Sequence, residues 1–537
     1  MSDKPLGAPV DATAGAAGEA PLYVRQATGL VRELKARDAL LMTLAFISIP
    51  LGYFFFAQLP GTFPGVNVPI AFLLTGLLVA PAMAVYALFA AIMPRSGGDL
   101  IFVGRVIHPL VGFVNNFGFV VFQICASAFL MLFVVDFAIP SMFQNIALTS
   151  GNEWWANAAA DLTNSTPRFL ITAALIALMT GLYCIGLKWV LRVFVPLILA
   201  QFIGVLLTFV ILLFSSHGGF ADSLASLGFG GIEAAATKAG FEPVGKSVGA
   251  TFESAALLIA VPCLAFMWSY FGGEVRRPRA TSMYITMAGV VISVVVLALI
   301  AWQANRVFGE NFQAAASFLS AEDPGAYPLN AEPFINTYLG ILTGSSLLVV
   351  VVGIAFAMGC LAAPFAGMIL VTRSLFAYSF DRMLPSGLAD VNMRFHTPVK
   401  ATLLVGAVMI GFLAGFVFSA STFTDFIAAS SLALFVVTGV TGLAGALLPY
   451  RRRDLYELSP VRAIAGIPVI TILGLLAVAI YGIYLYLLID RVGFADRTWW
   501  FVIGVYALGA IIAAVAYFRN RDAGVDLNTA LRELPPE

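Results

Sequence analysis

LLIAVPCLAFMWSYFGGEVRRP, residues Leu257–Pro278, is the stretch of sequence that decides the fold. It is apolar and uncharged as far as Phe271, as expected for a helix that crosses a membrane. Pro262 and the Gly272-Gly273 doublet nevertheless weaken a continuous helix. Because freed backbone groups are tolerated at membrane depth only where they face protein or water, an interrupted membrane helix is a candidate binding site. A kinked helix with no functional role is the alternative interpretation.

The whole chain has the composition of an integral membrane protein. Of its 537 residues, 60% are hydrophobic and 11% are charged, whereas soluble domains carry about 25% charged residues. The formal net charge of +0 gives no reason to expect a nucleic-acid partner. The 3 histidines lie far apart, and no nucleotide-binding or hydrolase motif occurs. We therefore expect an all-α membrane protein without metal or cofactor that is not an enzyme.

Apolar runs long enough to cross a membrane recur about twelve times, since each crossing takes roughly 20 residues. Most of the 29 Lys and Arg residues fall on the side that would also hold both termini. The positive-inside rule then predicts cytoplasmic termini in a plasma or inner membrane. The longer connections 138–168, 215–253 and 305–343 would lie outside and are expected to form short helices over the outer mouth. The expected spans are residues 39–60, 68–93, 109–137, 169–187, 189–214, 254–272, 281–304, 344–372, 398–419, 423–449, 466–489 and 499–518.

A second interrupted helix lies in the first span, within ISIPLGYFF (Ile47–Phe55). Pro50 cannot donate a backbone hydrogen bond and Gly52 loosens the helix, which is expected to open near its middle. Five spans separate the starts of the two interrupted helices, as expected if spans 1–5 and 6–10 are inverted repeats. The predicted parts are a cytoplasmic tail (1–38), a ten-helix transport core (39–449), two additional membrane helices (450–518) and a second cytoplasmic tail (519–537).

Four motifs occupy the predicted inner side of the membrane. MPRSGGD (Met93–Asp99) follows span 2, GGEVRRP (Gly272–Pro278) follows span 6, TRSLFAYSFDRMLP (Thr372–Pro385) follows span 8, and RFHTPVKA (Arg394–Ala401) precedes span 9. In this order they resemble the amino acid–polyamine–organocation superfamily of permeases, over roughly residues 30–450. The resemblance implies a five-plus-five inverted-repeat fold with discontinuous helices 1 and 6. It also implies alternating-access secondary transport of amino acids or small amines.

The resemblance places the substrate at the two helix openings. In the family, backbone amides of a small Gly-Ser-Gly turn hold the substrate's carboxylate, but the matching residues here begin with Pro50, which has no N–H. Organic amines, carboxylates without an α-amino group, and a non-transporting sensor or partner subunit therefore remain alternatives. The aromatic residues of span 6 suit either packing or a wall around the solute. The candidate substrate-binding residues are Ser48, Ile49, Pro50, Leu51 and Gly52 in span 1, and Cys263, Leu264, Ala265, Phe266 and Trp268 in span 6.

Charged residues of the inner motifs are candidates for a gate. Glu274, between a glycine pair and several arginines, is expected to form salt bridges that break when the gate opens. Asp99 is expected to pair with a nearby arginine such as Arg105. Exposed pairs of this kind contribute about 0–1 kcal/mol each, and a loop with ordinary topology charges is the alternative. The candidate gating residues are Arg95, Asp99, Glu274, Arg373 and Asp381.

The sequence leaves the coupling ion open between proton symport, exchange and facilitated diffusion. Relatives that use sodium supply hydroxyl groups from span 8, but here no Ser or Thr occurs between Ser346 and Thr372, so sodium is less expected. Some proton-coupled relatives place a lysine in span 5, near the position of Gln201. Ionisable residues inside a membrane are functional candidates by default, although the two aspartates lie near an interface, where solvated helix ends are the preferred explanation. The candidate coupling residues are Gln201, Asp136 and Asp425.

Overall fold

The computed structural model describes residues 34–329, 331–392, 397–419, 423–492, 497–525 and 527. Most of the predicted tail 1–38, residues 394–396 of the RFHTPVKA motif and residues 528–537 of the predicted tail 519–537 lie outside these residues. The described chain is almost entirely helical, and its strands are the short hairpin of β1 (Ala463–Ile464) and β2 (Ile467–Pro468). The prediction of an all-α protein is confirmed.

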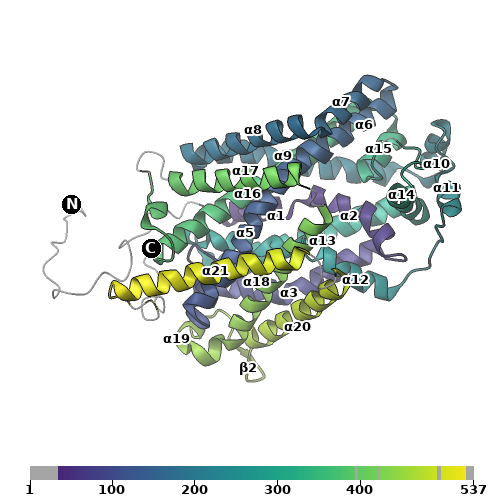
Figure 1. Cartoon of the computed structure of the whole chain (residues 1–537). Coiled ribbons are helices and arrows are strands. Elements are labelled where there is room, and N and C mark those ends of the chain that lie inside the picture. The colour runs from purple at the N-terminus through teal and green to yellow at the C-terminus, as the bar shows by residue number, and fades with distance from the viewer. Residues whose placement is uncertain are drawn as a thin grey trace, which may run out of the picture.

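Eleven helical segments in the described residues are long and apolar enough to cross a membrane. Figure 1 shows them running lengthwise beside one another as a bundle. Large apolar side chains on the outside of the bundle, such as Leu206, Leu475 and Ile511, are exposed, as expected for a surface that faces lipid. The segments are α1–α2 (Ala36–Ile47 and Ile49–Thr62), α3 (Val68–Ile92), α5 with η1 and α6 (Pro109–Phe133, Val134–Ala138 and Ile139–Ser150), α8 (Ser165–Ile185), α9 (Leu187–Phe214), α13 (Pro278–Phe308), α16 (Ser346–Phe380), α17 (Val399–Phe418), α18 (Phe423–Arg451), α20 (Val469–Val492) and α21 (Arg497–Asp522).

The two ends of the bundle differ. One end, called the capped face here, carries short helices in each of the three long connections, as the sequence predicted (Figure 1). These are the end of α6, α7 (Glu153–Thr163), α10 (His217–Ser226), α11 (Ile232–Lys238), α14 (Glu310–Glu322) and α15 (Ile335–Thr343). The opposite end, the terminal face, holds the first described residues and the C-terminal end of α21. It also holds α4 (Asp99–Val106), η3 (Gly272–Glu274), η4 (Ser386–Ala389) and α19 (Arg453–Tyr456).

The first membrane segment is broken at Ser48, slightly before the expected opening. Ser48 has a left-handed backbone (φ 47°, ψ 74°), which ends α1 and starts α2. Pro50 occupies the first turn of α2. Proline is favoured there because its missing N–H would have no helical partner in the first turn. The proline therefore starts a new helix instead of interrupting one.

The sixth predicted span, residues 254–272, is also broken, but at residues 259–261, before the candidate binding residues Leu264, Ala265 and Phe266. Its first half, α12 (Val248–Leu258), ends in a turn over residues 259–261. The second half, η2 (Pro262–Tyr270), is a 3₁₀ helix. Pro262 cannot donate the hydrogen bond that would continue α12, so the α-helix stops before it and resumes in the tighter form.

Candidate functional site

The two broken segments lie beside each other against α13. Gly289 of α13 marks this contact, because a Cβ atom there would lie 2.8 Å from Thr43 Cγ2 and 3.6 Å from the Cβ atom of Ala265. Thr43 belongs to α1 and Ala265 to η2, so the absence of a side chain on Gly289 lets both halves approach α13 closely. The structure thus brings together the two interrupted segments that the sequence predicted from distant parts of the chain.

The break in the first segment packs tightly against α16 and α9. The Ser48 hydroxyl donates a hydrogen bond to the carbonyl oxygen of Gly359, at 3.2 Å. A Cβ atom on Gly359 would lie 2.7 Å from Cγ of Pro50 and 3.3 Å from Cγ of Gln201. Gln201 is completely buried, and its side-chain amide makes no hydrogen bond within the described residues. A buried amide without partners beside a helix break is a candidate for contact with a polar solute.

Gly52, near this break, packs closely against a neighbouring helix. A Cβ on Gly52 would lie 2.5 Å from Cδ2 of Leu297, so Gly52 serves the packing of α2 on α13. Gly52→Leu is therefore a poor test of binding, because it would disturb the fold as well. Ile49 is fully buried, whereas Leu51 is partly exposed.

Gly359→Ala is a cleaner test of the break. The new methyl group would clash with the ring of Pro50, which is rigid, and overpacking of this kind costs about 1–3 kcal/mol. We expect the start of α2 to shift and solute affinity to fall while the protein still folds. Isothermal titration with a solute that binds the parent protein measures the change. Gly411→Ala on α17, where a Cβ would meet no atom within 4 Å, is the matched control. Equal affinity in both variants would remove Gly359 from the site.

The side chains of η2 mostly pack against neighbouring helices. The Phe266 ring stacks on Tyr86 of α3 with ring centroids 4.3 Å apart. The Trp268 indole N–H donates to the Thr286 hydroxyl at 2.8 Å. The Cys263 thiol lies 3.1 Å from the Tyr481 hydroxyl. These contacts favour the packing interpretation of the aromatic residues. Leu264 is partly exposed, whereas the other residues of η2 are buried.

Two buried ion pairs close the terminal face. Arg373 of α16 binds Glu274 of η3, with Nε 2.6 Å from Oε1. Arg105 of α4 binds Asp381 after α16, at 3.1 Å, and both side chains are at most 2% exposed. The expected pair of Asp99 with Arg105 is not present, since Arg105 is used by Asp381. The contribution of about 0–1 kcal/mol that is usual for an exposed ion pair does not apply to these two pairs. They are buried, and breaking a buried pair leaves an uncompensated charge.

Backbone hydrogen bonds reinforce the same face. Leu34, just before α1, donates to the carbonyl of Glu274 at 3.0 Å, and the N–H of Arg276 donates back to the carbonyl of Leu34 at 2.8 Å. Arg95, in the MPRSGGD segment, donates from its side chain to the carbonyl of Pro94 at 3.3 Å. The terminal ends of both broken segments are therefore tied to each other.

Asp99 lies at the centre of a buried polar cluster. Its carboxylate accepts hydrogen bonds from the hydroxyls of Tyr270 in η2 and Thr441 in α18. The amide of Asn116 in α5 donates to the Tyr270 hydroxyl at 3.0 Å, and Tyr378 of α16 donates to the Asn116 carbonyl oxygen. The sequence did not predict that tyrosines would surround Asp99. Their signal was the polar tip of each residue inside an apolar segment, where a buried hydroxyl needs a partner.

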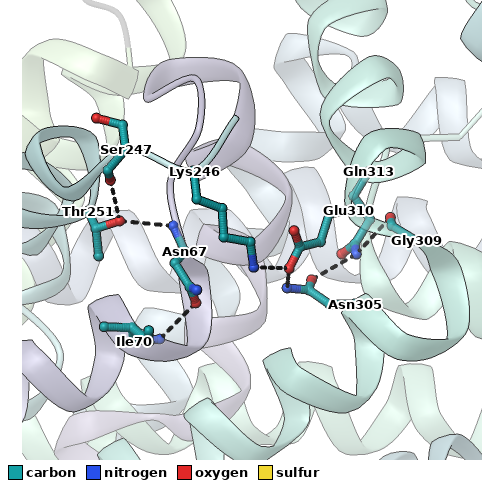
Figure 2. Close-up of polar contacts among 9 residues, drawn as sticks. All are labelled: Asn67, Ile70, Lys246, Ser247, Thr251, Asn305, Gly309, Glu310 and Gln313. Carbon is teal, nitrogen blue, oxygen red and sulfur yellow. Dashed lines mark hydrogen bonds and ion pairs between the residues drawn. The ribbon is translucent and has the colours of Figure 1, made fainter. Parts of the chain in front are cut away.

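The capped face is held by weaker, more exposed contacts. Figure 2 shows Lys246, before α12, reaching Glu310 of α14 at 2.8 Å, and Asn305 of α13 donating to the same carboxylate at 2.8 Å. In the same view the Asn67 N–H, before α3, donates to the Thr251 hydroxyl of α12 at 3.0 Å. The side chains of Lys246 and Glu310 are 53% and 43% exposed, so this pair is worth at most about 1 kcal/mol.

A cavity of about 470 Å³ lies at the capped face, between α2, α14 and the segment before α15. Phe54, Phe137 and Phe334 are among its lining residues, and the Phe137 ring packs on each of the other two with ring centroids 5.4 Å apart. Glu322 and Glu332 also line the cavity. Neither carboxylate forms an ion pair within the described part of the chain. We call this cavity the vestibule.

The remaining coupling-ion candidates do not meet at the breaks. Asp136 lies in the π-helical turn η1 and pairs with Arg168 of α8 at 3.2 Å, with both side chains partly exposed. Asp425 lies in the first turn of α18, and its side chain is outside the described residues. The described residues contain no group of three or more His, Cys, Asp or Glu that could hold a metal ion.

Comparison with known proteins agrees with this architecture. The sequence pattern of the amino acid permease family matches residues 39–512. Uncharacterized transporters of Mycobacterium bovis and of two strains of Mycobacterium tuberculosis are 26% identical to this chain over 345 residues. The alignment covers 63% of this chain and 64% of each relative, less than two thirds of their length. The match over nearly the whole membrane region shows that this chain belongs to the amino acid permease family of membrane transporters.

Proposed function

We propose that this protein is a secondary transporter that moves amino acids or related small amines by alternating access. The observation that carries the proposal is the packing of the two broken segments, interrupted at Ser48 and at residues 259–261, against each other and against α13. Two buried ion pairs close the terminal face of the same bundle. Broken membrane helices offer unpaired backbone groups that can bind a polar solute. The membership in the permease family supports the same class of function.

The charges around the pathway favour a solute with an ammonium group. The start of α2, just after Ser48, presents the positive end of a helix dipole to the break, which suits a carboxylate. The vestibule carries the two carboxylates Glu322 and Glu332 beside aromatic rings, and such a surface attracts organic cations. Amino acids satisfy both features, amines satisfy the second, and simple carboxylates satisfy only the first.

We infer the orientation of the protein in the membrane, and the side on which it is closed, from the differences between the two faces. We propose that the terminal face is cytoplasmic, because the Arg-rich motifs gather there and membrane proteins retain Lys and Arg on the cytoplasmic side. The structure then corresponds to a state closed toward the cytoplasm. Its solute would enter through the vestibule and pass the aromatic residues to reach the breaks. Spans 1–5 and 6–10 would form the two inverted repeats that rock against each other.

Thermal stabilisation of the purified protein tests the substrate class. A solute present at ~100 times its dissociation constant stabilises the folded state by about 2.7 kcal/mol if it binds only that state. We expect stabilisation by one or more amino acids or amines, and saturable uptake of the same solutes into proteoliposomes. Stabilisation without any uptake would support the sensor or partner reading. Stabilisation by carboxylates alone would contradict the proposed substrate class.

A further inference from the structure

The carboxylate of Asp99 occupies an unusual environment for an ionised group. Asp99 begins α4, in the connection between α3 and α5, and is completely buried. The groups that hold it are the hydroxyls of Tyr270 and Thr441, and neither of them carries a charge. The nearest guanidinium on its own helix, Arg105, is bound to Asp381. Within the described residues Asp99 thus forms no ion pair.

The titratable groups around Asp99 are also neutral. Phenols and thiols ordinarily have pKa values above 8 and carry no charge at physiological pH. The phenols and the thiol around Asp99 belong to α3, η2, α16 and α21. The nearby Arg105–Asp381 pair carries no net charge. The titratable side chains that face Asp99 are Tyr86, Cys263, Tyr270, Tyr378 and Tyr506.

A buried carboxylate without a cation is more stable when it is protonated. Isolated charges in a low-dielectric interior cost several kcal/mol or more, so such groups take up a proton instead. Burial raises the pKa of Asp99, whereas its hydrogen bonds from Thr441 and Tyr270 act in the opposite direction. The neighbouring Tyr86 hydroxyl also favours the ionised form, and the burial of Asp99 is the larger effect.

The position of Asp99 links this proton to the movement of the terminal face. Its partners come from η2 and α18, and the chain of hydrogen bonds continues through Asn116 of α5 to Tyr378 of α16. The N–H of Gly97, two residues before Asp99, also donates to the carbonyl of Tyr270 at 3.0 Å. Opening this face must separate η2 from α4 and admit water to Asp99. Water stabilises the ionised form and favours release of the proton.

We propose that Asp99 is a proton-binding site that is loaded when the terminal face is closed and unloaded when that face opens. This inference rests on the proposed alternation of the two faces and adds the proton as a ligand of the gate. It differs from the sequence-based assignment, in which Asp99 was one half of a salt bridge. Each opening toward the terminal side would release one proton there.

The pH dependence of thermal unfolding tests the site without requiring transport. Because the pKa of Asp99 is raised in the folded state, its contribution is fully present below the ordinary carboxyl pKa of about 4 and is lost as pH rises through the folded pKa. Between these values the folded-to-unfolded ratio of the parent should fall about tenfold per pH unit relative to Asp99→Asn. Asp390→Asn, which removes an exposed carboxylate of the pair with Lys400, should follow the parent. Parallel profiles for the parent and Asp99→Asn would overturn the proposal.

A second variant keeps the test decisive if Asp99→Asn does not fold. Tyr270→Phe removes a hydrogen bond that favours the ionised carboxylate, so it should move the decline in stability to higher pH. An unchanged midpoint would contradict the proton site. Solute exchange in proteoliposomes separates this proposal from the proposed function. Exchange in the parent whose pH profile is unchanged by Tyr270→Phe would refute the proton site alone. Absence of exchange at every pH, with the shifted stability profile retained, would refute the transport function alone.

Discussion

Glu274→Gln is expected to destabilise the closed terminal face by about 3–5 kcal/mol, the usual cost of removing one partner from a buried ion pair. Arg373, only 9% exposed at its side chain, would keep its charge without a counterion. The amide of the new glutamine can still accept a hydrogen bond, so the loss measures charge compensation. We expect a lower apparent Tm in detergent and faster opening toward the terminal side, measured as exchange rate at saturating solute.

The double variant Glu274→Gln/Arg373→Gln separates charge from packing. It removes both charges, so it should recover a large part of the stability lost in either single variant. Lys246→Gln at the capped face is the matched control, because its pair with Glu310 is about half exposed and should contribute less than about 1 kcal/mol. If Glu274→Gln and Lys246→Gln had equal effects, the terminal face would not be sealed by this pair.

Gly98→Ala is expected to disrupt the contact between the MPRSGGD segment and the sixth membrane segment. Gly98 has φ 52° and ψ −123°, a backbone conformation open mainly to glycine. A Cβ atom there would lie 2.7 Å from two ring carbons of Tyr270. Backbone strain and overpacking together should cost about 2–5 kcal/mol. The measurement is the free energy of unfolding in detergent, with exchange activity in proteoliposomes as a second readout.

Gly344→Ala distinguishes the clash from the strain. Gly344 ends α15 with φ 58°, and a Cβ there would meet no atom within 4 Å. Its substitution should therefore cost only the strain of a left-handed residue, about 1–2 kcal/mol. Comparable losses at the two positions would show that the Tyr270 contact is unimportant. A further change of Tyr270 to a smaller residue in the Gly98→Ala background should restore part of the stability.

Much of the architecture could be predicted because membrane helices can be recognised in a sequence by their length and hydropathy. The positions of the two broken segments also followed from local signals, since Pro50 and Pro262 both disfavour a continuous helix. The first break lies before its expected position, because a proline can begin a helix as well as interrupt one. Whether Pro50 does one or the other depends on the left-handed backbone of Ser48, which a serine rarely adopts.

The polar contacts could be predicted less well, because they join residues far apart in the sequence. Asp99 and Arg105 are near neighbours along α4, which made their pairing attractive. In the structure Arg105 instead binds Asp381, 276 positions away, and Asp99 is satisfied by hydroxyls. Only the packing of α4 against α5 and α18, together with the position of Asp381 just after α16, decides between these arrangements. The burial of the pairs, and hence their energetic weight, is likewise a property of the assembled fold.

The two faces therefore differ in the strength of their closure. The terminal face combines two buried ion pairs with backbone hydrogen bonds. The capped face relies on the exposed Lys246–Glu310 pair and on aromatic packing below the vestibule. In an alternating mechanism this difference makes the closed terminal face the favoured state without solute. Solute binding at the breaks must then supply the free energy that opens it, through contacts stronger in the open state.

Counterflow in proteoliposomes tests the central claim most directly, because exchange of labelled for unlabelled solute requires one site to face each side in turn. Vesicles loaded with an unlabelled amino acid or amine should accumulate the labelled solute transiently. Gly359→Ala should reduce this accumulation, and Gly411→Ala should leave it at the level of the parent. If a solute that binds and stabilises the folded protein shows no counterflow in the parent, the protein does not alternate between two faces, and the assignment as a transporter is wrong.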